Sequence, residues 1–286
     1  MALLRSRSNS GRNCGGSFTC ICQLAKTPFI LQEPSWPRGC RNLQRRLRAA
    51  FILVLVSLAL VAIAPVQAQP QRKAVILSSL DALAPMGYYA TSLKNDLAHA
   101  GYQVSLLSNS AVTLDFITTQ LNNYDVIVWR TNTYSFKHTT YWYVGQTVNL
   151  AAEQKYADDF DQGRVNGNAG ILGISNQFLS EHLQTGSLAN VKLVVLVSSN
   201  SVLIASYFIK AGVKTVISCN GSITLSFGQI DDLTDALFYY LGRGNTVFTS
   251  VYNTVAPFTR LELADPLDSA YSPPFWFTGD GTITIV

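Results

Sequence analysis

Residues 124–135 read YDVIVWRTNTYS, an apolar run that stops abruptly at polar residues. The stretch from Val126 to Trp129 has the composition of a buried strand. It ends in four polar residues, Arg130, Thr131, Asn132 and Thr133. In open α/β sheets, ligands bind outside the carboxyl ends of the strands. We therefore expect a strand here, with a candidate binding or catalytic site at its end.

On both sides of this stretch, short apolar runs alternate with segments of helical periodicity. Runs rich in β-branched residues predict further strands at 73–80, 102–108, 191–199 and 213–219. Apolar spacings of three and four residues predict helices at 86–101, 112–123 (with Thr113 as its N-cap), 176–184, 201–212, 229–244 and 246–256. Strands joined by helices through short links imply right-handed crossovers and a covered parallel sheet. The expected fold class is α/β, a three-layer α/β/α sandwich with a mostly parallel sheet.

The middle and the end of the chain are less regular. Residues 141–151 alternate enough to predict a hairpin, and 153–170 predict a short helix that runs into a glycine-rich loop. The glycines of 163–170 lack the preceding strand and the following GK[ST] of a phosphate-binding loop, so we expect a flexible loop. The closing residues 275–286, FWFTGDGTITIV, predict two short strand pieces around a Gly-Asp-Gly turn.

The first 68 residues have a different character. Residues 1–48 form a basic leader, or the product of a mis-called start, and are expected to be disordered. Residues 49–65 are uncharged and apolar, follow four arginines between 41 and 48, and precede a small-residue cleavage site after Ala68. These are the parts of a secretory signal peptide, so we expect residues 69–286 to be exported as a single domain, secreted or extracytoplasmic. An uncleaved anchor through residues 49–65 is the alternative, and only then would the protein contact a membrane.

Charge and cysteine divide at the same place. Residues 1–68 hold nine Lys or Arg and one acid, a net charge of +8, whereas residues 69–286 hold twelve Lys or Arg and sixteen acids, a net charge of −4. The basic balance therefore belongs to the leader, and no nucleic-acid partner is expected. Cys219 is the one cysteine after position 68, so the exported domain has no internal disulfide and depends on its apolar core.

Four segments, taken in order, resemble the caspase-like cysteine peptidase fold, a superfamily that includes caspases, clostripain, gingipains and CHAT domains. VIVWRTNT (126–133) resembles the strand whose end carries the catalytic His of that superfamily. VKLVVLVSSNS (191–201), followed by VLIASYFIKAGVKTVIS (202–218), resembles the segment in which a strand, a Cys nucleophile and a helix follow one another. TGDGTITI (278–285) is similar to the closing Gly-Asp strand of gingipain-like and CHAT domains. The resemblance spans residues 73–286.

Both positions of the His–Cys dyad differ in this chain. Asn132 stands at the His position, or Thr131 if the register shifts by one, and Ser199, preceded by Ser198, stands at the Cys position. A serine hydroxyl needs an adjacent base to become a nucleophile, and an asparagine amide is not a base at neutral pH. The resemblance therefore implies that Ser199 and Asn132 lie close together as a hydrogen-bonding pair without catalytic function.

The leading hypothesis is an exported, non-catalytic pseudopeptidase that binds a peptide or protein segment at the strand ends and needs no cofactor. The candidate binding residues share this location: Arg130, Thr131, Thr133, Ser198, Asn200, Tyr134 and Trp142. Their aromatic neighbours line a cleft in one interpretation and pack a hairpin in the other. Residues 198–200 fit the N-cap of a helix better than they fit a serine nucleophile with an oxyanion hole of backbone N–H groups.

Two other functions remain open at this point. The first is an active serine hydrolase or peptidase in which His138, six residues after Asn132, serves Ser199 as a relocated base. The second is a periplasmic-type small-molecule binding protein with a Rossmann-like sheet. The acidic groups elsewhere predict less: Asp158, Asp159 and Asp161 suit a solvated turn, and Asp231, Asp232 and Asp235 suit the start of a helix. No metal ligands occur at a recognisable spacing, and no metal site is expected.

Overall fold

The computed structural model describes Phe51, residues 71–219, 226–262 and 274–286, without the side chains of 258–262. Its first feature is a six-stranded sheet, sheet A, with the strand order β10-β9-β8-β3-β1-β2. The strands are β1 (Lys73–Ser78), β2 (Gln103–Ser108), β3 (Val126–Arg130), β8 (Leu193–Val197), β9 (Thr215–Cys219) and β10 (Phe275–Gly279). All neighbouring strands are parallel except β10, which runs antiparallel to β9.

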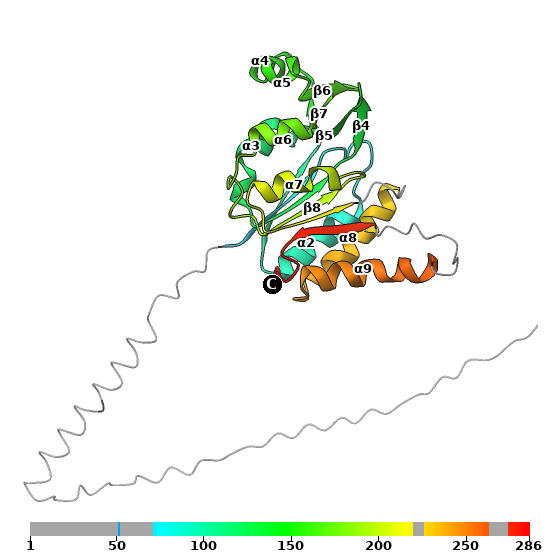
Figure 1. Ribbon diagram of the computed structural model, residues 1–286. Helices are drawn as coiled ribbons and strands as arrows, with labels where there is room; N and C mark the ends of the chain where they lie inside the picture. Colours follow the sequence, from blue (N-terminus) through cyan, green and yellow to red (C-terminus); the bar gives the residue numbers. More distant parts are fainter. Residues whose placement is uncertain (1–50, 52–70, 220–225, 263–273) are drawn as a thin grey trace, which may run out of the picture. The chain divides into compact units, whose positions relative to one another are not determined.

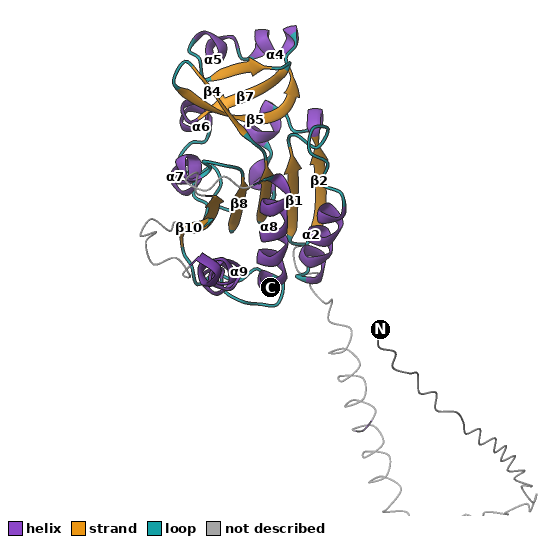
Figure 2. Ribbon diagram, turned by 90° about the vertical axis from the view of Figure 1, so that its right-hand side faces the viewer, coloured by secondary structure: helices purple, strands orange, loops and turns teal. Residues whose placement is uncertain are grey.

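Helices cover both faces of sheet A and complete the three-layer α/β/α sandwich (Figures 1 and 2). One face packs against α3 (Leu114–Thr119), α6 (Asn176–His182) and α7 (Val202–Lys210). The other packs against α2 (Tyr88–His99), α8 (Phe227–Leu241) and α9 (Val247–Glu262). Two short 3-10 helices, η1 (Asn109–Ala111) and η2 (Leu121–Asn123), flank α3. The predicted fold class is therefore confirmed at the level of its layers and its mostly parallel sheet.

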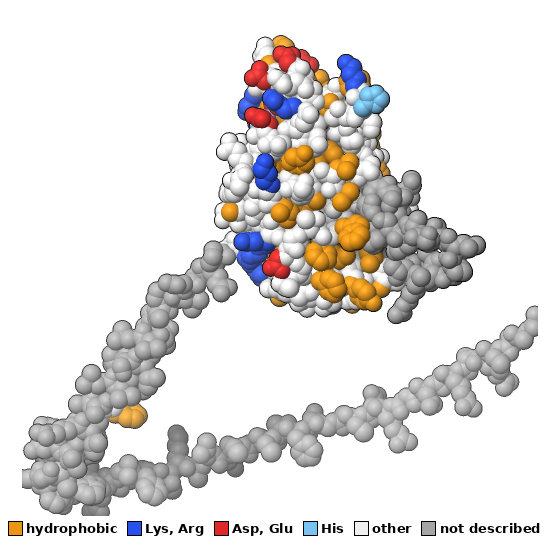
Figure 3. All heavy atoms as spheres, viewed as in Figure 1, with side chains coloured by type: hydrophobic (Ala, Val, Ile, Leu, Met, Phe, Trp, Pro, Cys, Tyr) orange, Lys and Arg blue, Asp and Glu red, His pale blue; other side chains and the backbone are white. Residues whose placement is uncertain are grey.

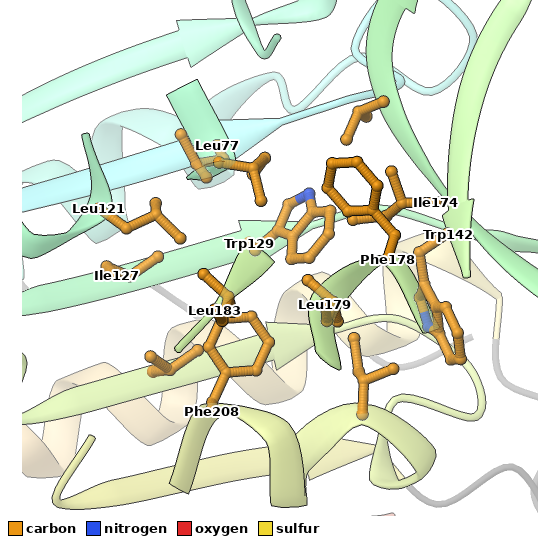
Figure 4. Packing of buried hydrophobic residues seen from close by; sticks show 14 of the residues in the cluster. Leu77, Leu121, Ile127, Trp129, Trp142, Ile174, Phe178, Leu179, Leu183 and Phe208 are labelled. Atoms are coloured by element: carbon orange, nitrogen blue, oxygen red, sulfur yellow. The ribbon is translucent and has the colours of Figure 1, made fainter. Parts of the chain in front are cut away.

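The complete burial of β3 and β8 explains why their apolar sequences predict strands. Every residue of both strands is buried. Alternate residues of β3 face opposite layers, so that Ile127 and Trp129 join one apolar cluster while Val126 and Val128 join the other. Figure 4 shows the first cluster, where Trp129 and Leu77 of the sheet meet Phe178 of α6 and Phe208 of α7. A continuous apolar run is what a strand covered on both faces requires.

A second, antiparallel sheet, sheet B, has the order β4-β5-β7-β6. Its strands are β4 (Thr133–Phe136), β5 (Thr139–Thr147), β6 (Val165–Asn168) and β7 (Ile171–Ser175), and β5 leads to β6 through α4 (Leu150–Lys155) and α5 (Ala157–Asp161). Sheet B lies next to the carboxyl ends of the sheet A strands (Figure 2). Since only two residues separate β3 from β4, the chain passes directly from one sheet into the other.

Three local predictions are wrong. The glycine-rich loop at 163–170 is a hairpin of β6 and β7, in which Val165 and Leu172 are buried and Gly170, with φ +79°, forms the turn. The hairpin predicted at 141–151 instead pairs β5 with β4, and its last residues begin α4. Of the two closing strand pieces, only β10 forms, and Ile283 and Ile285 pack as irregular chain.

On the face shown in Figure 3, charged and apolar side chains gather in different places. Charged side chains gather over α4 and α5, whereas apolar side chains gather over α7, α9 and β10. The exposed apolar residues of these elements include Leu203, Phe248, Tyr252 and Trp276.

The leader, the apolar run 49–65 and the cleavage site after Ala68 lie outside the described residues, apart from Phe51. Both sheets belong to one unit, Ala68–Val286. Within the described ranges, no helix is both long enough and apolar enough to cross a membrane.

Candidate functional site

The candidate site is formed where β3 and β8 end side by side. The two strands are parallel neighbours, with Arg130 paired to Val197, so the residues that follow them leave the sheet at the same edge. The backbone N–H of Thr131 donates to the carbonyl of Val197 at 3.0 Å, which extends the pairing past the last ladder residue. The polar residues that the sequence placed at two separate strand ends therefore meet.

Asn132 and Ser199 form a hydrogen-bonded pair at this edge. The Ser199 hydroxyl donates to Asn132 Oδ1 at 3.2 Å and lies 3.3 Å from the Thr133 hydroxyl. Asn132 Oδ1 also accepts the backbone N–H of Thr133 at 2.8 Å. All three residues are half-buried, so the group is reachable from solvent. The expected proximity of Asn132 and Ser199 is confirmed.

Backbone contacts hold Asn132 between the two sheets. Its carbonyl accepts the N–H of Tyr143 in β5 at 3.1 Å, while its side chain contacts Ser199 after β8. The hydroxyl of the preceding residue, Thr131, donates to the Tyr143 carbonyl at 2.6 Å. Asn132 thus links sheet A to sheet B, and its side chain cannot rotate freely without breaking one of these connections.

The loop after β8 does not cap α7 as residues 198–200 suggested. Ser201 is the N-cap of α7, and no side chain makes a cap hydrogen bond there. The Ser201 hydroxyl instead donates to the carbonyl of Leu196 at 3.0 Å and accepts the N–H of Cys219 at 2.8 Å. Asn200 has φ +58°, a left-handed conformation that asparagine tolerates better than most residues. This bend sends Ser199 toward Asn132.

Arg130 is not available to a ligand. Its side chain is 1 % exposed, and its guanidinium donates to both carboxylate oxygens of Asp231 in α8, at 2.7 and 2.9 Å. A third bond reaches the carbonyl of Ala84 at 2.8 Å. Burial raises the pKa of Asp231, and the Arg130 guanidinium opposes that rise. Asp231 therefore does more than start a helix, because it neutralises the buried Arg130 guanidinium next to the site.

Several other candidate binding residues are also internal. Thr131 and Ser198 are buried, and Trp142 belongs to the apolar core with 1 % of its surface exposed. Tyr134 lies on the face of sheet B opposite to Trp142, where its ring stacks on Tyr141 with the ring centroids 5.3 Å apart. Desolvation raises the pKa of Tyr134, which keeps its phenol neutral. The aromatic residues mostly pack the hairpin, so the accessible polar set is reduced to Asn132, Thr133, Ser199 and Asn200.

His138 does not reach Ser199. It forms the turn between β4 and β5 together with Lys137, and both have positive φ, 47° for Lys137 and 67° for His138. Paired positive φ values are typical of a two-residue type I′ hairpin turn. The three residue steps along β4 carry the chain roughly 10 Å away from Thr133 before this turn begins. His138 is exposed there, and no hydrogen bond joins it to Ser199 among the described residues.

Cys219 lies at the end of β9, next to the loop that carries Ser199. The thiol is buried, and desolvation raises its pKa to about 12. It is therefore a protonated thiol at neutral pH, and only the thiolate is a good nucleophile. Cys219 is therefore not a candidate nucleophile at this site.

A separate polar cluster lies in the sheet B region and was missed. Asp159 is buried, contrary to the solvated turn expected from the sequence. Its carboxylate accepts Arg164 Nε at 2.6 Å and lies 3.0 Å from His182 Nε2. The cluster joins α5, the start of β6 and α6, and it borders a pocket of about 430 Å³ lined by Gln154, Lys155, Tyr156, Ala157, Asp158, Asp159, Arg164, Glu181 and His182. No serine or cysteine lines this pocket.

Across residues 71–219, 226–262 and 274–286, no group of three His, Cys, Asp or Glu side chains is arranged to hold a metal ion.

The comparisons with known proteins add a structural likeness only. No protein-family model matches the sequence, and no curated protein matches it. Among solved structures, the chain is similar to protein GSU0716 from Geobacter sulfurreducens, with a TM-score of 0.38 and 12% identity over 74% of this chain and 94% of that protein.

Proposed function

We propose that this protein is a caspase-like domain that has lost its His–Cys dyad, and that it binds an extended peptide or protein segment at the ends of β3 and β8 without hydrolysing it. The observation that carries the proposal is the 3.2 Å hydrogen bond from the Ser199 hydroxyl to Asn132 Oδ1. The resemblance in sequence requires these two strand ends to be neighbours, and β3 and β8 pair directly. The pattern of residues 41–68 supports a location outside the cytoplasm.

The chemistry of the pair supports binding rather than catalysis. A serine hydroxyl attacks a carbonyl only when a base removes its proton during the reaction. Asn132 Oδ1 accepts hydrogen bonds from Ser199 and Thr133, but an amide oxygen does not take the proton. The Asn132 amide N–H groups make no hydrogen bond to any described residue. They are donors that can bind the carbonyl oxygen of a ligand.

The test is labelling of the purified protein with a fluorophosphonate probe, followed by intact mass measurement and peptide mapping. An active serine hydrolase is the positive control, and Ser199→Ala and His138→Ala are the matched variants. We expect no labelling of the wild-type protein, because Ser199 has no base. Labelling at Ser199 that disappears in both variants would establish the competing function, a serine hydrolase with His138 as base, and would overturn the proposal.

A second test rebuilds the dyad. In Asn132→His combined with Ser199→Cys, the new imidazole and thiol occupy positions that now share a hydrogen bond. A neighbouring imidazolium lowers a thiol pKa, so iodoacetamide should alkylate the introduced thiol about tenfold faster at pH 7 than in Ser199→Cys alone. Equal rates in the two variants would mean that the two side chains do not face each other as the proposal requires.

A further inference from the structure

The open edge of β4 begins at the candidate site. β4 is an outer strand of sheet B, and no described strand pairs with its other edge. Its first residue is Thr133, whose hydroxyl lies 3.3 Å from that of Ser199. An extended segment that pairs with this edge would therefore reach the Asn132–Ser199 pair with one end. This inference rests on the proposed function and concerns how the same site holds its ligand.

The pairing register shows which backbone groups face outward. Tyr143 N–H donates to the Asn132 carbonyl, so residues 132 and 143 form a hydrogen-bonded pair. Hydrogen-bonded and non-hydrogen-bonded pairs alternate in an antiparallel ladder, which places the backbone groups of Thr133 and Ser135 on the side away from β5. Asn132 Oδ1 takes the Thr133 N–H. The Thr133 carbonyl and both backbone groups of Ser135 remain open to a partner strand.

The charge of the hairpin limits the kind of segment that fits. Residues 133–147 include Lys137 but no Asp or Glu, within a domain of net charge −4. Lys137 and His138 are exposed at the far end of β4, and Lys137 Nζ lies 5.2 Å from the centre of the Phe136 ring. Phe136 is 43 % exposed. This end of the strand therefore presents a cation beside an apolar ring, which suits an acidic residue next to an apolar one.

We propose that β4 receives an extended acidic peptide as an added strand, with main-chain hydrogen bonds to Thr133 and Ser135, an acidic side chain near Lys137, and its other end at Asn132 and Ser199. Strand addition gives affinity through the backbone and selectivity through alternate side chains. The four residues of β4 fit a correspondingly short segment of the ligand.

The experiment selects binders from a random library of unstructured peptides of about ten residues, long enough to span β4. Enriched peptides are then measured by fluorescence anisotropy against variants of the purified protein. Ser135→Pro removes the outward N–H and no bond to β5, because this N–H points away from β5. Proline is tolerated at such positions of an edge strand. We expect it to weaken binding about tenfold or more, since main-chain bonds supply the affinity of an added strand. Ser135→Ala keeps the N–H and should bind like wild type.

Charge is tested separately. Lys137→Ala should weaken binding roughly threefold, the size of one exposed ion pair, and the enriched peptides should contain Asp or Glu. Enriched peptides without acids, with affinity unaffected by Lys137→Ala, would overturn the acidic part of the inference.

The two proposals fail in different ways. Peptides that bind more weakly to Asn132→Ala but equally to Ser135→Pro and wild type would retain the proposed function and overturn strand addition. Peptides indifferent to Asn132→Ala, or no enriched peptide at all, would overturn both. If Ser135→Pro lowers the melting temperature by circular dichroism, N-methylation of alternate peptide backbone nitrogens replaces it. One of the two methylation patterns should then abolish binding, and indifference to both would exclude a strand.

Discussion

Sheet A is covered by helices on both faces, whereas sheet B packs one face into the same apolar core and carries tyrosines on the other. In sheet A, β3 and β8 are buried along their whole length, and Arg130, the one charged residue within these two strands, is paired with Asp231. In sheet B, β6 and β7 are short strands with glycine at 167 and 173, and stacked tyrosines cover the outer face. The buried charge in sheet A needs its partner, whereas the tyrosine face of sheet B leaves no room for a side chain at Gly173. The two sheets should therefore respond to different substitutions.

The largest effect should follow the loss of one partner in the sealed ion pair. Asp231→Ala leaves the Arg130 guanidinium buried without its carboxylate, and breaking such a pair lowers the free energy of unfolding by about 3–5 kcal/mol. Urea denaturation followed by far-UV circular dichroism measures the change. Asp232→Asn is the matched control, because Asp232 accepts a hydrogen bond from the exposed Tyr88 hydroxyl. Equal effects of the two variants would mean that the buried pair does not support sheet A.

Sheet B should instead be sensitive to a single methyl group. A Cβ added to Gly173 would lie 2.7 Å from the Tyr134 ring. Gly173→Ala should therefore destabilise the protein by about 1–3 kcal/mol through overpacking. Tyr134→Ala in the same molecule should recover part of this loss, and the double-mutant cycle in urea measures how much. In the sheet A region, Gly228→Ala meets no atom within 4 Å and should not destabilise. A neutral Gly173→Ala would contradict the difference drawn between the two sheets.

The joint between the sheets should matter little for stability. Ser199→Ala removes the neutral bond to Asn132, and a half-buried hydrogen bond of this kind contributes about 0.5–1.5 kcal/mol. The coupling between Ser199→Ala and Asn132→Ala in a double-mutant cycle measures the pair itself. We expect a value of about 1 kcal/mol or less. A much larger value would identify the pair as a structural connection rather than a binding site.

The smallest effect is a pH dependence at the surface. The Lys155 ammonium and the Tyr156 hydroxyl both donate hydrogen bonds to Asp115 of α3. These bonds lower the pKa of the Asp115 carboxyl, and the bond from Lys155 has the larger effect. A lowered pKa in the folded state adds stability above the pKa of a free Asp, and this stability is lost as the pH falls through the folded value. Because the side chains of Lys155 and Asp115 are both more than half exposed, Asp115→Asn should lower the free energy of unfolding at pH 7 by only about 0.2–1 kcal/mol. Urea titrations should show this difference disappear in acid, and a difference that persists there would point to another cause.

Sequence could predict the parts of the fold that repeat a simple pattern. The unbroken apolar runs of β3 and β8 are such a pattern, as is the Thr113 cap of α3, whose hydroxyl accepts the Phe116 N–H at 3.0 Å. Within sheet B, β6 and β7 were missed because they contain Gly167 and Gly173, which lower strand propensity and leave no alternation of apolar residues.

The site was predictable only in part. The resemblance brought Asn132 and Ser199 together although 67 residues separate them. Arg130 and Asp231 are 101 residues apart, and each sits in a local context that suits another role, a strand tip for the arginine and a helix start for the aspartate. Nothing in the sequence around Arg130 indicates that this residue will be buried in an ion pair instead of exposed at the end of its strand.

The alkylation rate of the buried Cys219 thiol can report local opening of the region around Ser199. A protonated thiol enclosed at the end of β9 reacts with an alkylating reagent only in molecules where this edge has opened. A chain that begins after Ala68 has no other cysteine, so one mass increment counts one opening. If alkylation is faster than global unfolding, the strand ends open on their own, and a ligand bound beside Ser199 should slow the reaction. The same measurement can therefore follow binding without any label at the site.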